Sequence, residues 1–174
     1  SWNENNKSYG DPFSMSVPDL KFGQDKILKT FASDPNIIGH LSQYGPITKK
    51  DVTKIIHIIP AGIKSRLENF HSIIAKRAKE LKFGEFIFDS NKTILIEKTD
   101  PYQYFIACQK AEKEDGIAVV VHPQRQDIHF KAKKGLGNKA VRSQMVNLGT
   151  FDKILSEPDG KWVLPSIYNI VAGI

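Results

Sequence analysis

The sequence predicts an α/β fold, doubly wound, in which a mostly parallel sheet of about four strands is flanked by helices. Two runs, residues 54–59 and 117–121, are dominated by β-branched apolar residues, as is typical of strands buried on both faces. Between them, apolar residues from Ile63 to Leu81 recur at steps of one, three or four, which indicates an amphipathic helix. Strands that alternate with helices in this way require crossover connections, and therefore a parallel sheet.

Local signals bound the other elements. Gly84 ends the first helix, and Asp100 before Pro101 is a suitable N-cap and first residue for a second helix, which we expect to run to about Glu114. Gly116 opens the second buried strand. The shorter elements that we expect are strands at 86–88, 93–97 and 144–147, a short helix that begins near residue 127 or 128, and an apolar helix over 163–174.

The length of 174 residues fits one domain with an extension. Residues 1–16 are polar and without periodicity, so we expect a flexible arm there. Residues 17–50, with a short edge strand near Leu20 and Phe22, are interpreted as a lead-in extension packed on the main domain, which spans 51–174. The apolar end of the sequence has no polar last turn, so we expect another segment or another chain to follow it.

Composition excludes several classes of protein. Apolar residues make up 40% of the chain, and no apolar run approaches the ~18 residues of a membrane-spanning helix, so we expect no membrane partner. The single cysteine, Cys108, can form neither an internal disulfide nor a zinc site with a second cysteine. Because the first thirty residues also show no secretory signal, a reducing, cytoplasmic compartment is expected.

Most of the excess positive charge lies in one segment. The net charge is +6, from 25 basic and 19 acidic residues. Residues 128–143 hold no acid and contribute five cations, Lys131, Lys133, Lys134, Lys139 and Arg142. Such a cluster is either a solvated, lysine-rich helix end or a surface that binds phosphates.

The strand at 117–121 leads directly into this basic segment. In open α/β sheets, ligands bind beyond the carboxyl ends of the strands, where helix N-termini present free N–H groups. Residues 122–127 occupy that position, so an anion bound there would meet backbone donors and lysines together. Gln144, at the start of the next strand, would add an amide donor.

Common catalytic motifs are missing from the sequence. It has no Walker A, GxSxG or HExxH pattern and no carboxylate pair suited to two-metal hydrolysis, so we expect a protein that is not an enzyme. Cys108 and His57 fall inside apolar patterns and are interpreted as core residues. His122 and His129 flank the loop at 122–127 and are candidates for a functional role.

Two stretches of the chain resemble a known family. The lead-in VPDLKFG, followed about twenty residues later by LSQYGPI, is similar to the start of the MID region in prokaryotic Argonautes. The stretch from GIAVVVHP through IHFKAKKGLGNKAVRSQMVN to LPSIYNIVAGI resembles the strand, specificity loop, phosphate pocket and last helix of that domain. The chain therefore resembles the MID domain of an Argonaute protein, most of all the short prokaryotic members.

This resemblance implies a Rossmann-like domain of four strands that captures the 5′ end of a guide strand. The family holds the terminal phosphate with an aromatic residue or a His, a Lys four residues later and a Gln about a dozen residues on. His129, Lys133 and Gln144 match this pattern, with Lys131 and Lys134 as competitors for Lys133. A further lysine that the family has near the end of the domain finds no match here.

The resemblance also implies how the first base is recognised. The family reads or stacks on this base with the loop that corresponds to Pro123, Gln124, Arg125, Gln126 and Asp127. No cofactor is expected, although in the family a divalent cation such as Mg²⁺ can accompany the 5′-phosphate.

Together, the residues and the resemblance predict a nucleic-acid-binding module that anchors a 5′-phosphorylated single-stranded guide, RNA or DNA. Lys139 and Arg142 are expected to follow the next backbone phosphates. The expected protein partner is a PIWI domain, in the same chain or another, because that domain carries the family's catalytic carboxylates. Two alternatives stay open: a Rossmann-like binder or enzyme for a small phosphorylated ligand, and an interaction subunit that docks a partner through its apolar last helix.

Overall fold

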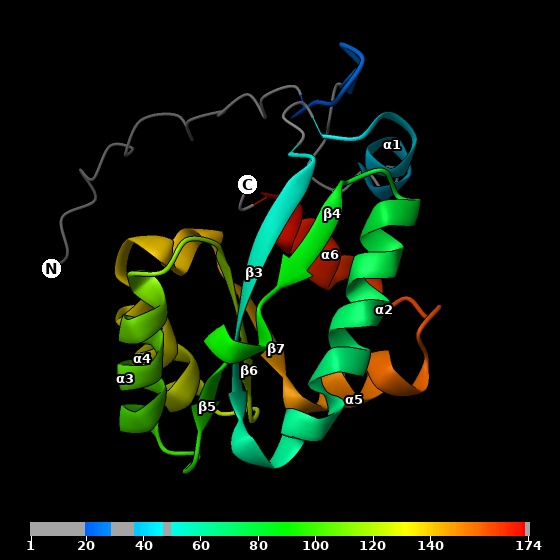
Figure 1. The fold of residues 1–174 in the computed structure, drawn as a ribbon. Helices are drawn as coiled ribbons and strands as arrows, with labels where there is room; N and C mark the ends of the chain where they lie inside the picture. The colour runs from blue at the N-terminus through cyan, green and yellow to red at the C-terminus, as the bar shows by residue number, and fades with distance from the viewer. Residues whose placement is uncertain (1–19, 29–36, 47–49, 173–174) are drawn as a thin grey trace, which may run out of the picture. The chain divides into compact units, whose positions relative to one another are not determined.

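The computed structural model describes residues 20–28, 37–46 and 50–172 (Figure 1). The chain divides into two compact units, residues 1–47 and 48–174. The flexible arm expected at 1–16 lies outside the described residues.

The first unit contains a hairpin and a helix. Strands β1 (Leu20–Lys21) and β2 (Ile27–Leu28) pair antiparallel, and α1 covers Ile37–Tyr44. The edge strand predicted near Leu20 is thus present as β1. Its partner β2 was not predicted, because the two strands are only two residues long and carry almost no periodic pattern.

The second unit holds a parallel sheet. Its order is β4-β3-β6-β7, and β5 pairs with β3 as well, next to the carboxyl end of β3. All of these pairs are parallel, which confirms the predicted α/β class with a Rossmann-like, mostly parallel sheet. The elements, in chain order, are β3 (Val52–Pro60), η1 (Ala61–Arg66), α2 (Leu67–Glu80), β4 (Glu85–Phe88), η2 (Ser90–Lys92), β5 (Ile94–Ile96), α3 (Pro101–Glu112), β6 (Ile117–His122), α4 (Gln126–Leu136), η3 (Gly137–Arg142), β7 (Gln144–Asn147), α5 (Leu148–Ser156) and α6 (Val163–Ala172).

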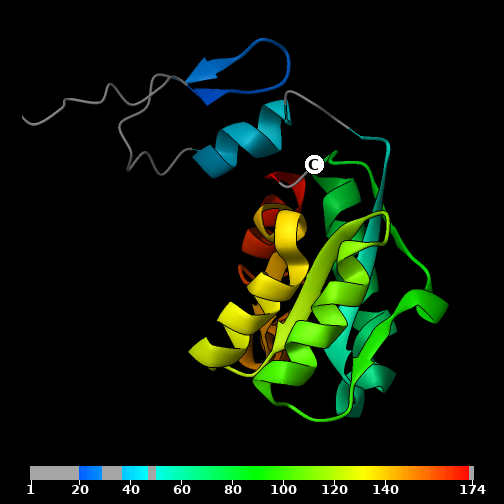
Figure 2. The same cartoon turned by 90° about the vertical axis from the view of Figure 1, so that its left-hand side faces the viewer.

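Helices cover both faces of this sheet. Figure 1 shows α3 and α4 on one side and α2, α5 and α6 on the other, and Figure 2 shows α3 and α4 side by side. The central strands β3 and β6 are buried along most or all of their length, so both of their faces are apolar. Among the described residues, no helix is both long enough and apolar enough to span a membrane.

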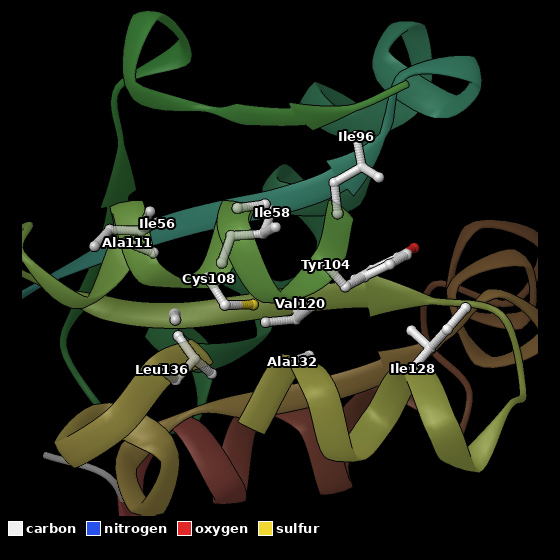
Figure 3. Packing of buried hydrophobic residues seen from close by; sticks show 12 residues of the cluster. Ile56, Ile58, Ile96, Tyr104, Cys108, Ala111, Val120, Ile128, Ala132 and Leu136 are labelled. Carbon is white, nitrogen blue, oxygen red and sulfur yellow. The ribbon is translucent and has the colours of Figure 1, made fainter. Parts of the chain in front are cut away.

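The face under α3 and α4 is closed by one apolar cluster (Figure 3). Ile58 of β3 and Val120 of β6 point to this face, as do Cys108 of α3 and Ala132 of α4. The two helices approach closely at Gly135, where a Cβ atom would collide with the carbonyl oxygen of Phe105. Small residues at this contact therefore bring α4 against α3 and fix its direction.

Local signals explain most element boundaries. The side chain of Asp100 accepts hydrogen bonds from the backbone N–H groups of Tyr102 and Gln103, with Pro101 as the first helical residue, so the predicted cap of α3 is confirmed. The helix predicted from Ile63 begins instead as the 3-10 segment η1 and becomes α-helical at Leu67.

Within the second unit, one α-helix was not predicted, and neither was α1 in the first unit. Helix α5 follows β7 without a loop, and its cap is the side chain of Asn147, which accepts from the N–H of Thr150. The same residue ends the strand and caps the helix, so no loop separates the two elements in the sequence.

Candidate functional site

A pocket of about 610 Å³, open to solvent, lies at the carboxyl ends of β6 and β7 and the N-terminus of α4. This is the place where open α/β sheets bind ligands, because the amide groups of a helix N-terminus face it. The pocket is lined by His122, Gln124, Arg125, Gln126, His129, Phe130, Met145 and Asn147.

His122 forms the inner wall of this pocket. It ends β6, it is only 6% exposed, and its Nδ1 lies 2.7 Å from the carbonyl oxygen of Pro123. Because a carbonyl oxygen only accepts, Nδ1 carries the hydrogen and Nε2 is left with a lone pair. Burial lowers the pKa of His122, and the nearby His129 lowers it further, so the ring is neutral near pH 7.

His129 and Phe130 stand together on the first turns of α4. The ring of His129 meets that of His122 edge to face, with 5.4 Å between centroids. Phe130 follows at 6.1 Å from His129 and is 65% exposed, which is unusual for a large apolar side chain. The pocket therefore combines two imidazoles with a free aromatic face.

The loop at 123–127 is stiffened by its own contacts. The guanidinium of Arg125 donates two hydrogen bonds to the carboxylate of Asp127, at 2.6 and 3.2 Å. Asp127 also accepts from the N–H of Ile128, and these donors, Arg125 first, lower the pKa of its carboxyl group. Gln124 and Gln126 are exposed, so their amides remain available to a ligand.

Lys133 lies one turn after His129 on the same face of α4. It does not line the pocket. Its ammonium donates to the carbonyl oxygen of Ala140 at 2.6 Å and to the hydroxyl of Ser143 at 2.9 Å. Partial burial lowers its pKa. Lys133 therefore joins α4 to the segment that leads into β7.

Gln144, the third member of the predicted phosphate set, lies on another face. In the parallel register it is opposite Val119, whereas Met145 is opposite Val120 and packs with the α3 and α4 cluster. Because successive strand residues point to opposite faces, Gln144 is directed away from the face that carries α4. Its amide donates to the carbonyl of Met145 at 2.7 Å, and Gln144 does not line the pocket.

The remaining cations of the basic segment lie elsewhere. Lys131 and Lys134 are exposed, and Lys134 lines a groove beside the end of α3. Lys139 and Arg142, in η3, line a cleft at the opposite end of α4. Of the predicted phosphate and loop residues, the structure brings together His129 with Gln124, Arg125 and Gln126 in the pocket.

Three pocket residues were not singled out from the sequence. Phe130 directly follows the candidate His129, and an aromatic residue among lysines is the sequence signal that could have identified it as a pocket residue. Met145 and Asn147 could have been found from the alternation of β7, since both point to the face of α4.

Other predicted core residues are buried as expected. His57 is 1% exposed and its Nε2 lies 2.9 Å from Nδ1 of His71. Cys108 is fully buried, and burial raises the pKa of its thiol to about 12, which suppresses the thiolate. Among the described residues, no group of three or more His, Cys, Asp or Glu is arranged to hold a metal ion.

No protein-family model matches the chain, and no curated protein matches its sequence.

Proposed function

We propose that this chain is a nucleic-acid-binding module, not an enzyme, that anchors the 5′-phosphorylated end of a single-stranded guide, RNA or DNA, as the MID domain of an Argonaute does. The observation that carries the proposal is the pocket itself. A helix N-terminus, two imidazoles and an exposed phenyl ring meet there at the carboxyl ends of the strands. A phosphate and a base are the two groups that such a pocket suits.

In this proposal His129 binds the terminal phosphate at the N-terminus of α4. The positive end of the helix dipole and the free backbone N–H groups favour an anion there. The Nε2 atom of His122 has no hydrogen-bond partner among the described residues. In this proposal it takes up a proton when the doubly charged terminal phosphate binds. Lys133, one turn away, adds a positive charge.

The first base is proposed to stack on Phe130, with the exposed amides of Gln124 and Gln126 and the loop residue Arg125 at its edges. Pro123 and Asp127 act by holding the loop, through the contacts of Arg125 with each of them. Lys131 and Lys134 remain exposed competitors for the phosphate. Gln144 is directed to the opposite face of the sheet from α4, so to reach a phosphate it would have to release the carbonyl of Met145 and also turn toward the pocket.

The two alternatives make different demands on the molecule. A site for a small phosphorylated metabolite would be expected to enclose its ligand, whereas this pocket is open to solvent. An interaction subunit would expose the apolar face of its last helix, whereas Ile167 and Ile170 are fully buried. These observations favour a strand end as ligand. A PIWI domain, in the same or another chain, is the proposed protein partner.

Titration with matched oligonucleotides tests the proposal. RNA and DNA strands with a 5′-phosphate or a 5′-hydroxyl, each with four different first nucleotides, are compared on the intact chain and on His129→Ala. We expect the 5′-phosphate to strengthen binding roughly tenfold or more, as charge-assisted contacts do, and His129→Ala to remove most of that gain. Gln144→Ala is expected to lower the affinity less than His129→Ala does, because the amide of Gln144 donates to the carbonyl of Met145.

The control is Lys79→Ala, an exposed residue of α2 on the other side of the sheet. Equal affinity for phosphorylated and hydroxyl strands would overturn the proposal. Tight binding of a free nucleoside monophosphate, with no gain from a longer strand, would favour the small-ligand alternative.

A further inference from the structure

A second cleft, of about 290 Å³, opens at the amino ends of β3 and β6. It lies at the other end of α4 from the pocket described above, and α4 has 11 residues, which is about 16 Å of helix. The cleft is lined by Lys50, Val52, Thr53, Lys54, Glu114, Asp115, Gly116, Ile117, Lys139 and Arg142.

Positive charge is in excess in this cleft. Asp115 pairs with Lys54 at 2.9 Å, and its pKa is lowered by Lys54 first and then by Lys139 and Lys50. One carboxylate therefore faces three ammonium groups.

The other acid of the cleft is engaged outside it. Glu114 pairs with Lys92 at 3.1 Å, and Lys92 does not line the cleft. Among the described residues, Lys50 and Arg142 have no ion pair, and both are exposed. An incoming anion would thus find cations that no acid neutralises.

The wall of the cleft holds an unpartnered hydroxyl group and a glycine. Thr53 is 4% exposed, and its buried hydroxyl oxygen has no hydrogen-bond partner among the described residues. Gly116 has a φ of 137°, and a Cβ there would lie 2.8 Å from the carbonyl oxygen of Lys54. A side chain at this position is therefore disfavoured, which keeps the floor of the cleft open.

We propose that this cleft binds phosphate groups of the sugar-phosphate backbone of a single strand, away from its 5′ end. Multiple ammonium groups around a shallow, open cleft suit successive phosphodiesters, which carry one charge each and are held without base readout. The inference rests on the proposed function for the identity of the polyanion. Lys139 and Arg142 were already expected to contact backbone phosphates, and the proposal adds Lys50 and Lys54 to them. All four residues then belong to a site separate from the strand-end pocket.

The test uses a 5′-hydroxyl strand, which isolates the cleft from recognition of the terminal phosphate. Its affinity is measured for the intact chain, for the double variant Lys50→Glu, Arg142→Glu, and for the control Lys76→Glu, Lys79→Glu, which makes the same charge change on α2. All four residues are exposed, so the variants are expected to fold, and Lys50→Gln, Arg142→Gln repeats the test with a smaller charge change.

The cleft variant is expected to bind about tenfold more weakly or worse than the control variant, for phosphorylated and hydroxyl strands alike. Its salt dependence should become shallower by about 1.4 in the slope of log K against log salt, because two contacts at roughly 0.7 each are lost. Equal affinities of the cleft and control variants for the hydroxyl strand would overturn the inference.

Two further readouts separate this inference from the proposed function and from a small ligand. If the cleft variant weakens binding but the 5′-phosphate brings no gain in any variant, the inference stands and the proposed function fails. Inorganic phosphate or pyrophosphate is added as a competitor. Displacement of the strand at equal phosphate-group concentration would show a free phosphate as ligand and overturn the assignment to a strand.

Discussion

The ammonium of Lys133 on α4 lies 2.9 Å from the hydroxyl of Ser143, the residue before β7, and 2.6 Å from the carbonyl oxygen of Ala140. The Ser143 hydroxyl itself lies 2.8 Å from the same carbonyl. Three polar groups therefore share one small network that holds η3 against α4. Lys133, which the resemblance to a MID domain implies as a phosphate ligand, therefore has a structural role in the folded chain.

Replacing this lysine should lower stability. Lys133→Met keeps the stem but removes the donor from two acceptors, so we expect the free energy of unfolding to fall by about 1–2 kcal/mol. Urea denaturation measures the free energy of unfolding. The control is Lys131→Met, because Lys131 is an exposed residue on the same helix. A Lys133→Met chain as stable as the control would mean that the network contributes nothing.

Phe130 offers a second test, on binding alone. Because its ring is 65% exposed, Phe130→Ala should leave the fold unchanged, but it should weaken binding of a 5′-phosphorylated strand by about 1–3 kcal/mol through lost base stacking. Phe130→Tyr should bind as the original chain does. Tyr102, 66% exposed on α3 and outside the pocket, gives the matched control Tyr102→Ala. If both alanine variants bind equally well, the first base does not stack on Phe130.

Much of the fold could be predicted from the sequence because its signals are local. The β-branched runs of β3 and β6 and the capping pair of Asp100 and Pro101 each act within a few residues. Helix α5 was missed because Asn147 serves at once as strand end and helix cap, so no loop separates the two elements. A boundary between a strand and a helix is difficult to recognise from the sequence pattern when no loop separates them.

The site was harder to predict, because it depends on faces and not on spacing. The positions of His129 and Lys133 follow from helical periodicity, and both lie on one side of α4. Gln144 lies in a strand, where a step of one residue reverses the face, so a sequence interval alone does not say whether it meets α4. The strand register, which pairs Gln144 with Val119, was needed to decide on which face of the sheet Gln144 lies.

The contact of α3 with α4 gives a prediction on packing. A Cβ at Gly135 would collide with the carbonyl oxygen of Phe105 and lie 2.9 Å from the Cβ of Cys108. Gly135→Ala must push the helices apart and should cost about 1–3 kcal/mol, as overpacking does. Gly62→Ala is the control and should be nearly neutral, because beyond its own chain neighbours and helix backbone no described atom lies within 4 Å of the new Cβ. Thermal unfolding of both variants decides whether the helices can shift without cost.

The buried pair of His57 and His71 predicts acid sensitivity. Nε2 of His71 lies 3.1 Å from the carbonyl oxygen of Phe86 and so carries the hydrogen, which leaves Nδ1 to accept from Nε2 of His57. The buried Nδ1 of His57 has no hydrogen-bond partner in the described part of the chain, so a proton added there finds no acceptor. Burial first, and then the charge of His71, lower the pKa of His57 to about 3, and burial lowers the pKa of His71.

The sign of the effect follows from these lowered pKa values. Unfolded His57 titrates near 6.5, so between pH 6.5 and about 3 the unfolded chain binds a proton that the folded chain excludes. Stability is complete above pH 6.5 and is lost as the pH falls, by about 2 kcal/mol between pH 7.5 and 5 for His57 alone. Urea denaturation at these two pH values, for the intact chain and for His57→Met, measures it. The variant will be less stable throughout, because His71 loses its donor, but its loss between the two pH values should be smaller by that amount. Equal losses in the two proteins would show that His57 does not exclude the proton.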